Sequence, residues 1–367
     1  MGNQSIHMAL HGYGYIGRFH VLASQLNLAC AVAAPRLVWD AAVVRSLESE
    51  AAARAAESFS FVTDDLAALL QQPIDAIDIT SPNALHYAPF QLALEMGWGI
   101  YCEKPISHQL EEAQEMAQRV KQAGLVHQVA LMYRFHPAVI EARDWLLSGQ
   151  LGRVLTFRAE LLHGGYLNPN RTMSWRLQSG EAGGGAMMDL GIHLIDTLHM
   201  LLGRVDSVSA ATKTFVTRRS GQSGDEAVDV DDWASATLQM TSGAVGTLEV
   251  SRVHYGRERD FIDIVCEHGV LHIPLESYRG VELHTHHSDL LAPEVSHASI
   301  LQPLGAKFAQ STLLNLHATG LAVFARRLCG GTVDIPVPTF DDAVLAQQVV
   351  AAAMESGDRD GARIQVG

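Results

Sequence analysis

The chain lacks several features that mark common protein classes. Its four cysteines are far apart and form no C-x-x-C pair, which argues against zinc ribbons and disulfide frameworks and favours buried free thiols. No apolar run reaches the roughly 18 residues of a membrane helix, so no membrane partner is expected. With 26 basic against 40 acidic residues and no basic run, the net charge of −14 predicts no nucleic-acid binding.

The first residues lack the basic region with which a secretory signal peptide begins. They lead directly into the apolar segment Ile6–Leu10, which is predicted to be a strand. We therefore expect a cytoplasmic protein. A length of 367 residues with 48% hydrophobic residues is enough for two domains of ordinary size.

The most informative segment present is a G-x-G-x-x-G motif directly after this strand, made by Gly12, Gly14 and Gly17. In a dinucleotide site the first glycine allows a sharp turn, the second lets the backbone approach a pyrophosphate, and the third lets the helix pack on the sheet. The phosphates lie against free N–H groups at the helix N-terminus. An apolar helical pattern follows the motif, so the sequence predicts a dinucleotide-binding loop.

The first third of the chain alternates apolar strand-like runs with helical patterns, which is typical of a parallel sheet covered by helices. We predict a Rossmann domain over residues 1–132. Helices are expected at 16–26, 41–56, 64–71, 84–96 and 109–123, and strands at Ile6–Leu10, Leu28–Ala33, Ala76–Thr80, Gly99–Cys102 and Val126–Leu131.

The rest of the chain, residues 133–367, is predicted to be a second α/β domain with a large, mostly antiparallel open sheet. Its polar stretch Arg218–Asp229 is expected to be a flexible loop. Helices are expected at 138–148, 186–202 and 341–356, and alternating strands at 153–162, 205–216, 233–240, 244–253, 259–266 and 269–273.

Three landmarks point to one family: the glycine motif, the tripeptide Glu103-Lys104-Pro105, and the run from Gly183 to Asp196 with the pattern G-G-G-A-x-x-D-x-G-x-H. On these motifs the chain resembles the Gfo/Idh/MocA oxidoreductases over essentially its whole length. The resemblance implies an N-terminal Rossmann domain, a nicotinamide cofactor and a sugar or cyclitol substrate. Members of the family commonly associate through the C-terminal sheet, and the alternating apolar residues at 233–253 suggest such a face, so a homodimer or homotetramer is expected.

A hydride leaves a secondary alcohol only as its hydroxyl proton is removed, so the site needs a base beside the nicotinamide. The resemblance assigns this task to Lys104 and His193. A lysine at a strand end beside a cofactor cleft could exchange a proton near neutrality, because burial disfavours its charged form. Asp189 stands four residues before His193 on a predicted helix and could orient the imidazole. A solvated surface lysine and a core histidine are the structural alternatives.

The cofactor is expected to lie against the ends of the predicted strands. At the end of the second predicted strand, where an acidic residue would normally hold the ribose of NAD, Ala34 and Arg36 stand instead. An arginine there could receive the 2′-phosphate of NADP, so both NAD and NADP remain open. The predicted cofactor residues are Gly12, Gly14, Tyr15, Ile16, Gly17, Ala34, Arg36, Ser81, Pro82, Asn83, His86, Glu103 and Lys104.

Polar and aromatic residues in or near the irregular segment 163–185 are candidates for substrate binding, because such loops carry specificity. Packing under the loop is the alternative for Trp175. No metal is expected, since Asp189, His193 and Asp196 have no further ligand cluster and His284, His286 and His287 do not converge in a strand. The predicted substrate residues are Lys104, Arg134, His163, Tyr166, Trp175, Arg176, Asp189 and His193.

The sequence thus predicts an NAD(P)-dependent oxidoreductase that transfers a hydride to or from a carbinol carbon of a sugar, cyclitol or sugar derivative. Two alternatives stay open. One is a redox-neutral enzyme that cleaves glycosides by transient oxidation with the cofactor recycled. The other is a regulator that binds the nucleotide without catalysis.

Overall fold

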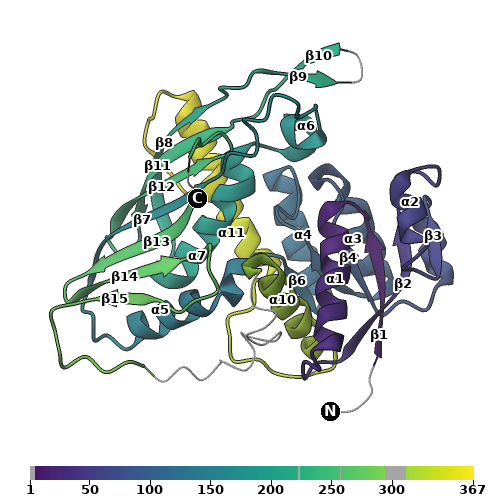
Figure 1. Ribbon diagram of the computed structural model, residues 1–367, viewed down its shortest axis with the longest axis horizontal. Helices are drawn as coiled ribbons and strands as arrows, with labels where there is room; N and C mark the ends of the chain where they lie inside the picture. The colour runs from purple at the N-terminus through teal and green to yellow at the C-terminus, as the bar shows by residue number, and fades with distance from the viewer. Residues whose placement is uncertain (1–4, 222–223, 257, 294–310) are drawn as a thin grey trace. The chain divides into compact units, whose positions relative to one another are not determined.

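The computed structural model describes residues 5–221, 224–256, 258–293 and 311–367. The chain divides into two compact units (Figure 1). Unit 1 comprises residues 1–132 and 299–341, and unit 2 comprises residues 133–298 and 342–367. The domain expected over 133–367 therefore does not include the later segment that ends at Asp341, which belongs to unit 1. None of the helices in the described part of the chain has the length and apolar character needed to cross a bilayer.

Unit 1 is built on a six-stranded, all-parallel sheet in the order β3-β2-β1-β4-β5-β6. In such a sheet every strand ends at the same edge, and loops at this edge bind ligands. The strands are β1 (Ser5–His11), β2 (Arg36–Val43), β3 (Phe61–Thr63), β4 (Ala76–Ile79), β5 (Gly99–Cys102) and β6 (His127–Val129).

The helices of unit 1 bury apolar stripes at helical spacing. In α4, Ala113, Met116, Ala117 and Val120 are buried, and the helix ends at Gly124 with φ of 64°. The last helix, α10, packs along α1 although their sequences are far apart. The helices are α1 (Tyr15–Ala29), α2 (Glu50–Ala55), α3 (Tyr87–Met96), α4 (Leu110–Ala123) and α10 (Thr312–Leu328), with shorter turns η1 (Leu66–Gln71) and η2 (Asn83–Leu85).

The predicted strand at 28–33 is wrong, and of the helix predicted at 41–56 only the last part forms, as α2 (Glu50–Ala55). The apolar residues up to Ala29 continue α1, the chain turns at Ala31 with φ of 52°, and β2 begins at Arg36. A short apolar run does not distinguish a buried helix end from a buried strand, which explains the error. The true β2 carries Ala41 and Ala42 in the core, each with 0% exposure.

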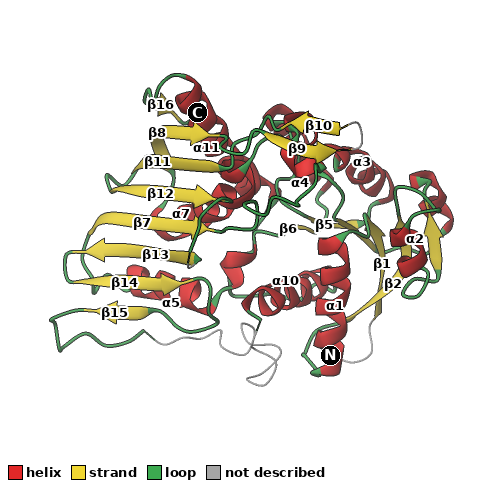
Figure 2. Cartoon of the chain, turned by 45° about the horizontal axis from the view of Figure 1, so that its top comes forward, coloured by secondary structure: helices red, strands yellow, loops and turns green. Residues whose placement is uncertain are grey.

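Unit 2 is built on an eight-stranded sheet in the order β15-β14-β13-β7-β12-β11-β8-β16, shown side by side in Figure 2. All neighbours are antiparallel except β7 and β12. The strands are β7 (Val154–Leu162), β8 (Val205–Lys213), β11 (Trp233–Met240), β12 (Val245–Ser251), β13 (Arg259–Cys266), β14 (Gly269–Pro274), β15 (Glu282–His284) and β16 (Ile364–Gln365).

Helices α5 (Pro137–Leu147) and α7 (Ile192–Leu202) pack on this sheet, and Ser356 of α11 (Phe340–Asp358) accepts a hydrogen bond from Ala210 of β8. The expected loop at Arg218–Asp229 is instead a polar hairpin of β9 (Arg218–Gly221) and β10 (Gly224–Ala227). Its polar residues show no apolar alternation, so the pattern could not reveal it. The expected helix at 186–202 begins as a π-helix, η5 (Met187–Gly191), before α7.

Candidate functional site

The glycine loop has the geometry that a dinucleotide site requires. Gly12 has φ of +101°, and a Cβ there would lie 2.6 Å from the backbone nitrogen of Ser81. A Cβ on Gly17 would lie 2.4 Å from the carbonyl oxygen of Gly12, so the start of α1 packs tightly on the loop. A Cβ on Gly14, the N-cap of α1, would meet no atom of the described residues within 4 Å. The loop is therefore closed toward the protein and open at Gly14, where a pyrophosphate can approach.

Two more loops end at the same edge of the sheet. The loop after β4 carries Ser81, whose hydroxyl contacts Nδ1 of His11 at 3.0 Å, and then Pro82 and Asn83. His86 is fully buried and links this loop to the one after β5, since its ring nitrogens lie 2.9 Å from the Ser81 carbonyl oxygen and 3.1 Å from that of Pro105. Burial lowers the pKa of His86. His86 therefore connects the two loops through buried contacts with their backbones.

Lys104 and Glu103 follow β5 directly. The Lys104 backbone nitrogen donates to Oε2 of Glu103 at 3.2 Å, and the Lys104–Pro105 peptide is cis. The Glu103 carboxylate is buried and faces His20 of α1, with 3.2 Å between Oε1 and Nε2. His20, Glu103 and His317 together bring metal-ligating atoms within 4.8 Å of one another. His20 and His317 were not among the predicted site residues.

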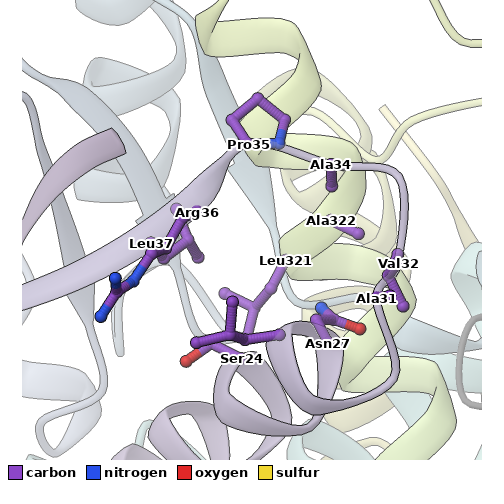
Figure 3. A pocket seen from close by; sticks show the side chains of 11 residues that line it. Ser24, Asn27, Ala31, Val32, Ala34, Pro35, Arg36, Leu37, Leu321 and Ala322 are labelled. Atoms are coloured by element: carbon purple, nitrogen blue, oxygen red, sulfur yellow. The ribbon is translucent and has the colours of Figure 1, made fainter. Parts of the chain in front are cut away.

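Ala34 and Arg36 do not lie where the prediction placed them. Arg36 starts β2 rather than ending it, and in a parallel sheet the start of a strand lies at the edge opposite the glycine loop. Both residues line a small pocket with Leu321 and Ala322 of α10, as Figure 3 shows. β2 ends at Val43, and the first polar side chains after it are the exposed Arg45 and the half-buried Ser46.

In unit 2, the run of glycines is held by Asp231. Its two carboxylate oxygens accept hydrogen bonds from the backbone nitrogens of Gly185 and Met187, both at 2.8 Å. A Cβ on Gly185 would lie 1.7 Å from the Asp231 carbonyl oxygen, so only glycine is tolerated there. Asp231 thereby sets where the π-helix carrying Asp189 begins.

Asp189 pairs with an arginine that the sequence did not single out. Nη2 of Arg252 donates to Oδ2 of Asp189 at 2.8 Å, and the guanidinium lies 4.8 Å from the centre of the Tyr166 ring. Arg171 covers the same ring at 3.7 Å. Burial opposes ionisation of Arg252, but the charge of Asp189 outweighs it and raises the pKa of Arg252. Asp189, Tyr166 and Arg252 thus form one polar cluster.

His193 and His163 belong to the same part of unit 2. The His193 ring lies edge-on to the Tyr133 ring, with 5.5 Å between centroids. Nε2 of His163 contacts Oδ1 of Asp260 at 2.8 Å, and this hydrogen bond raises the pKa of His163, with Asp189 a smaller contributor. Burial, with smaller contributions from Asp260 and Glu276, raises the pKa of Tyr133, so the phenol stays neutral.

Arg134 is placed differently. Its Nε donates to both carboxylate oxygens of the buried Asp196, at 3.1 and 2.9 Å, and its Nη2 lies 2.9 Å from Oδ1 of Asp342. The side chain is 6% exposed, which favours a structural role in unit 2. Trp175 and Arg176 stack on each other at 4.3 Å in the irregular segment.

The residues that sequence reasoning missed are buried, and two of them lie next to strands rather than in a recognisable motif. Arg252 follows β12 and Asp231 precedes β11, and neither stands in a motif. His20 had a usable signal, because it shares the buried stripe of α1 with Gly17, Val21 and Ser24. A histidine on such a stripe needs polar partners.

Comparisons with known proteins agree with this geometry. Residues 6–131 match the family described as an oxidoreductase family with an NAD-binding Rossmann fold, and residues 139–272 match the GFO/IDH/MocA C-terminal domain. Levoglucosan dehydrogenase of Pseudarthrobacter phenanthrenivorans is 35% identical over 277 residues, which is 69% of this chain and 69% of the relative. The scyllo-inositol 2-dehydrogenase (NAD(+)) of Bacillus subtilis is 27% identical over 98% of this chain and 96% of its own.

Solved structures give the same result. A levoglucosan dehydrogenase in complex with NADH and levoglucosan has a TM-score of 0.85 and 29% identity, covering 99% of this chain and 100% of that one. The similarity therefore extends over both of the domains expected from the sequence.

Proposed function

Because this chain belongs to the Gfo/Idh/MocA family of oxidoreductases, we propose that it is an NAD(P)-dependent dehydrogenase acting on a carbinol carbon of a sugar, cyclitol or sugar derivative. The assignment of a nicotinamide cofactor rests on the glycine loop. The loop packs against the protein at Gly12 and Gly17 and leaves Gly14 open. The residues that would hold the cofactor are those of the glycine loop and the two loops beside it.

When bound, a nicotinamide cofactor accepts or returns the hydride of the carbinol carbon. The protein must then move the hydroxyl proton. We assign this proton to Lys104, at the end of β5, and to His193, at the start of α7. Asp189 is already paired with Arg252, so its expected role is to orient a substrate hydroxyl or this arginine rather than to exchange a proton.

The substrate side is assigned to polar and aromatic groups of unit 2. Tyr166, Arg252 and Asp189 form one cluster. His163 adds an imidazole whose pKa is raised by its hydrogen bond to Asp260, so it is protonated more readily than a free histidine. Paired charges and a phenol hydroxyl are suited to hydrogen-bond the hydroxyls of a sugar ring. The relatives' named substrates, levoglucosan and inositols, are the first candidates.

The cofactor preference is proposed from the true end of β2. Residues 44–47, directly after Val43, contain no carboxylate; the exposed Arg45 and the neighbouring Ser46 stand there instead. A carboxylate at this position holds the ribose hydroxyls of NAD, whereas an arginine accommodates the 2′-phosphate of NADP. We therefore propose that NADP is accepted beside NAD.

The decisive experiment is a screen of sugars, cyclitols and glycosides with both cofactors, measured by absorbance of the reduced nicotinamide. Turnover of a free sugar or cyclitol with stoichiometric reduced cofactor supports the proposal. Glycoside cleavage with catalytic cofactor and no net reduction would replace it with redox-neutral chemistry. Tight NADH binding without turnover of any polyol would favour a regulator.

The assembly is also a proposal: a homodimer or homotetramer through the open face of the C-terminal sheet. The apolar side chains of β11, Ala234, Ala236 and Leu238, are buried, so the apolar face expected from the sequence is part of the core. The opposite face carries small polar and β-branched side chains that are exposed or half-exposed, namely Ser235, Thr237, Val245 and Val265.

A further inference from the structure

A buried histidine joins two carboxylates in unit 1. Nδ1 of His20 lies 2.8 Å from Oδ2 of Asp78, and its Nε2 lies 3.2 Å from Oε1 of Glu103. His20 and Asp78 are both 0% exposed. The three side chains come from α1, β4 and the end of β5, so this contact connects three elements of the nucleotide-binding fold.

The geometry gives His20 a charge. Burial alone would favour the neutral ring, but the charge and hydrogen bond of Asp78, followed by those of Glu103, outweigh it and raise the pKa of His20 to about 10. Burial would likewise protonate Glu103, but its 3.2 Å contact with His20 and the imidazolium charge lower the pKa of Glu103 to about 2. Burial raises the pKa of Asp78 as well, so the ion pair that these shifts support near neutral pH is the one between the His20 imidazolium and the Glu103 carboxylate.

Two further groups face this pair. The His317 ring of α10 lies 4.7 Å from the His20 ring, and burial together with the His20 charge lowers the pKa of His317 to about 3, so it stays neutral. The Tyr101 ring of β5 packs edge-on to His20 at 5.5 Å. The positive charge of Lys104 also acts on Glu103 and His317.

We propose that His20 is a positioning residue for the reaction: it holds the Glu103 carboxylate, and Glu103 in turn holds the backbone of Lys104. This inference rests on the proposed function, because it gives Lys104 a role in proton transfer. The structural chain is short, since Glu103 binds His20 through one oxygen and the Lys104 backbone nitrogen through the other. A change at His20 is transmitted to Lys104 by a single side chain.

The same atoms could ligate a divalent cation, because His20, Glu103 and His317 are a donor set that zinc uses. Charge argues against it. His20 already carries a proton between the two carboxylates, and the ammonium of Lys104 acts on the same group of residues. A cation would have to displace the proton and tolerate the lysine. The metal interpretation is therefore one outcome of the test.

The test compares His20→Gln with Val21→Ala. Glutamine keeps a hydrogen-bond donor but removes the charge, whereas Val21→Ala opens a cavity in the same helix, in the core of unit 1, without removing a polar group. Each variant is assayed for kcat and KM against pH with the substrate found in the screen. The affinity for NADH is measured against pH by nicotinamide fluorescence.

Without the imidazolium, burial raises the proton affinity of Glu103, so His20→Gln should acquire an acidic limb in kcat at least about one pH unit above that of the wild type. We compare the loss of NADH affinity between neutral and mildly acidic pH in the two proteins. This loss should be about tenfold larger for His20→Gln than for the wild type. Val21→Ala should keep the wild-type pH dependence of both quantities. Identical pH profiles for His20→Gln and the wild type would overturn the proposal.

Different measurements test the proposed dehydrogenase function and the positioning role of His20. Absence of turnover in the wild type refutes the proposed function, while the pH dependence of NADH binding still decides the role of His20. If His20→Gln does not fold, Asp78→Asn is the second variant, and ¹⁵N-histidine NMR of the wild type reports the state of His20 directly. A neutral His20 at pH 7, or stoichiometric zinc in the purified protein that chelation removes, would overturn the proposal.

Discussion

At the scale of single residues, pairing decides which polar side chains are available for chemistry. Arg134 was expected to contact substrate, but its Nε and Nη2 atoms bind Asp196 and Asp342 in the interior of unit 2. Asp189 binds Arg252, which no motif contains. A buried ion pair is costly to break, so such residues hold the site in shape rather than exchange protons.

Lys104→Met and His193→Asn should each lower kcat by about 10² to 10⁴-fold, the usual contribution of a positioned acid–base group. The two losses should be less than additive, because both groups serve one proton. NADH affinity should change little, because each substitution removes a side chain that should not hold the pyrophosphate and leaves the backbone of its loop in place. Steady-state kinetics of both single variants and the double variant measure this, and Asp189→Asn should lose less. Near-normal kcat in both single variants would disprove the assignment.

Arg45→Asp should change the cofactor preference. A carboxylate after β2 repels a 2′-phosphate and can hold ribose hydroxyls, so we expect the Kd for NADP to rise by about tenfold or more while that for NAD stays or falls. Fluorescence titration with both reduced cofactors measures the ratio. Arg36→Asp is the matched control, because Arg36 lies at the start of β2 and should leave the ratio unchanged. Equal effects of the two substitutions would contradict the assignment.

His20 should also make stability depend on pH. Its pKa is raised from 6.5 to about 10 on folding, so its contribution is fully present below pH 6.5 and is lost as the pH rises toward about 10. The unfolding free energy from urea denaturation should therefore decline over this range in the wild type. His20→Gln should show a flatter profile there. A wild-type profile that rises between these pH values would contradict the ion pairs drawn for His20.

At the scale of elements, the start of α1 shows why three glycines recur at fixed spacing. Gly12 turns the chain with a positive φ, Gly17 allows contact with the loop before it, and a Cβ at Gly14 would have no neighbour within 4 Å in the part of the chain that the structure describes. Only the last of these is an opening for a ligand. The first two are constraints of folding.

Gly14→Ala and Gly17→Ala should therefore fail in different ways. Alanine at position 14 meets no protein atom, so the melting temperature should stay close to that of the wild type while the Kd for NADH rises by about tenfold or more. The Cβ of an alanine at position 17 would lie 2.4 Å from the Gly12 carbonyl oxygen. This substitution should therefore destabilise unit 1. Thermal unfolding and NADH titration of both variants test this. Unchanged NADH affinity in Gly14→Ala would refute the binding loop.

At the scale of the whole molecule, the open sheet of unit 2 is the surface through which we propose that copies of the chain associate. An antiparallel sheet can leave one face to solvent, and this face combines Ser235 and Thr237 with Val245, Val265 and the half-exposed Phe261. Its mixed character is typical of an interface that is not purely apolar.

We expect light scattering to report a dimer or tetramer of the 39.8 kDa chain at micromolar concentration. Val245→Glu, at the start of β12 on this face, should shift the population toward the monomer, because it buries a charge in the interface. Leu291→Glu, at an exposed position outside the sheet, is the control. A monomeric wild type would refute the assembly.

The sequence by itself determined the type of fold and the main motifs. Strands β11 and β13 and the strand before Lys104 have the bounds that alternation or apolar runs predicted, because each is a continuous pattern with turn residues at its ends. The glycine loop followed from its position after a strand. Local patterns of this kind depend only on neighbours in the sequence.

Tertiary structure alone decided the pairings between distant residues and the edge at which each strand ends. The run at 28–33 has the pattern of a strand but includes the end of α1, and this shift places the expected ribose site at Arg36 instead of after the true end of β2 at Val43. His20 meets Asp78 and Glu103 only because α1, β4 and β5 pack together, and Arg252 meets Asp189 across 63 residues. Burial and partner charge set the protonation of these groups, and both arise only when the chain is folded.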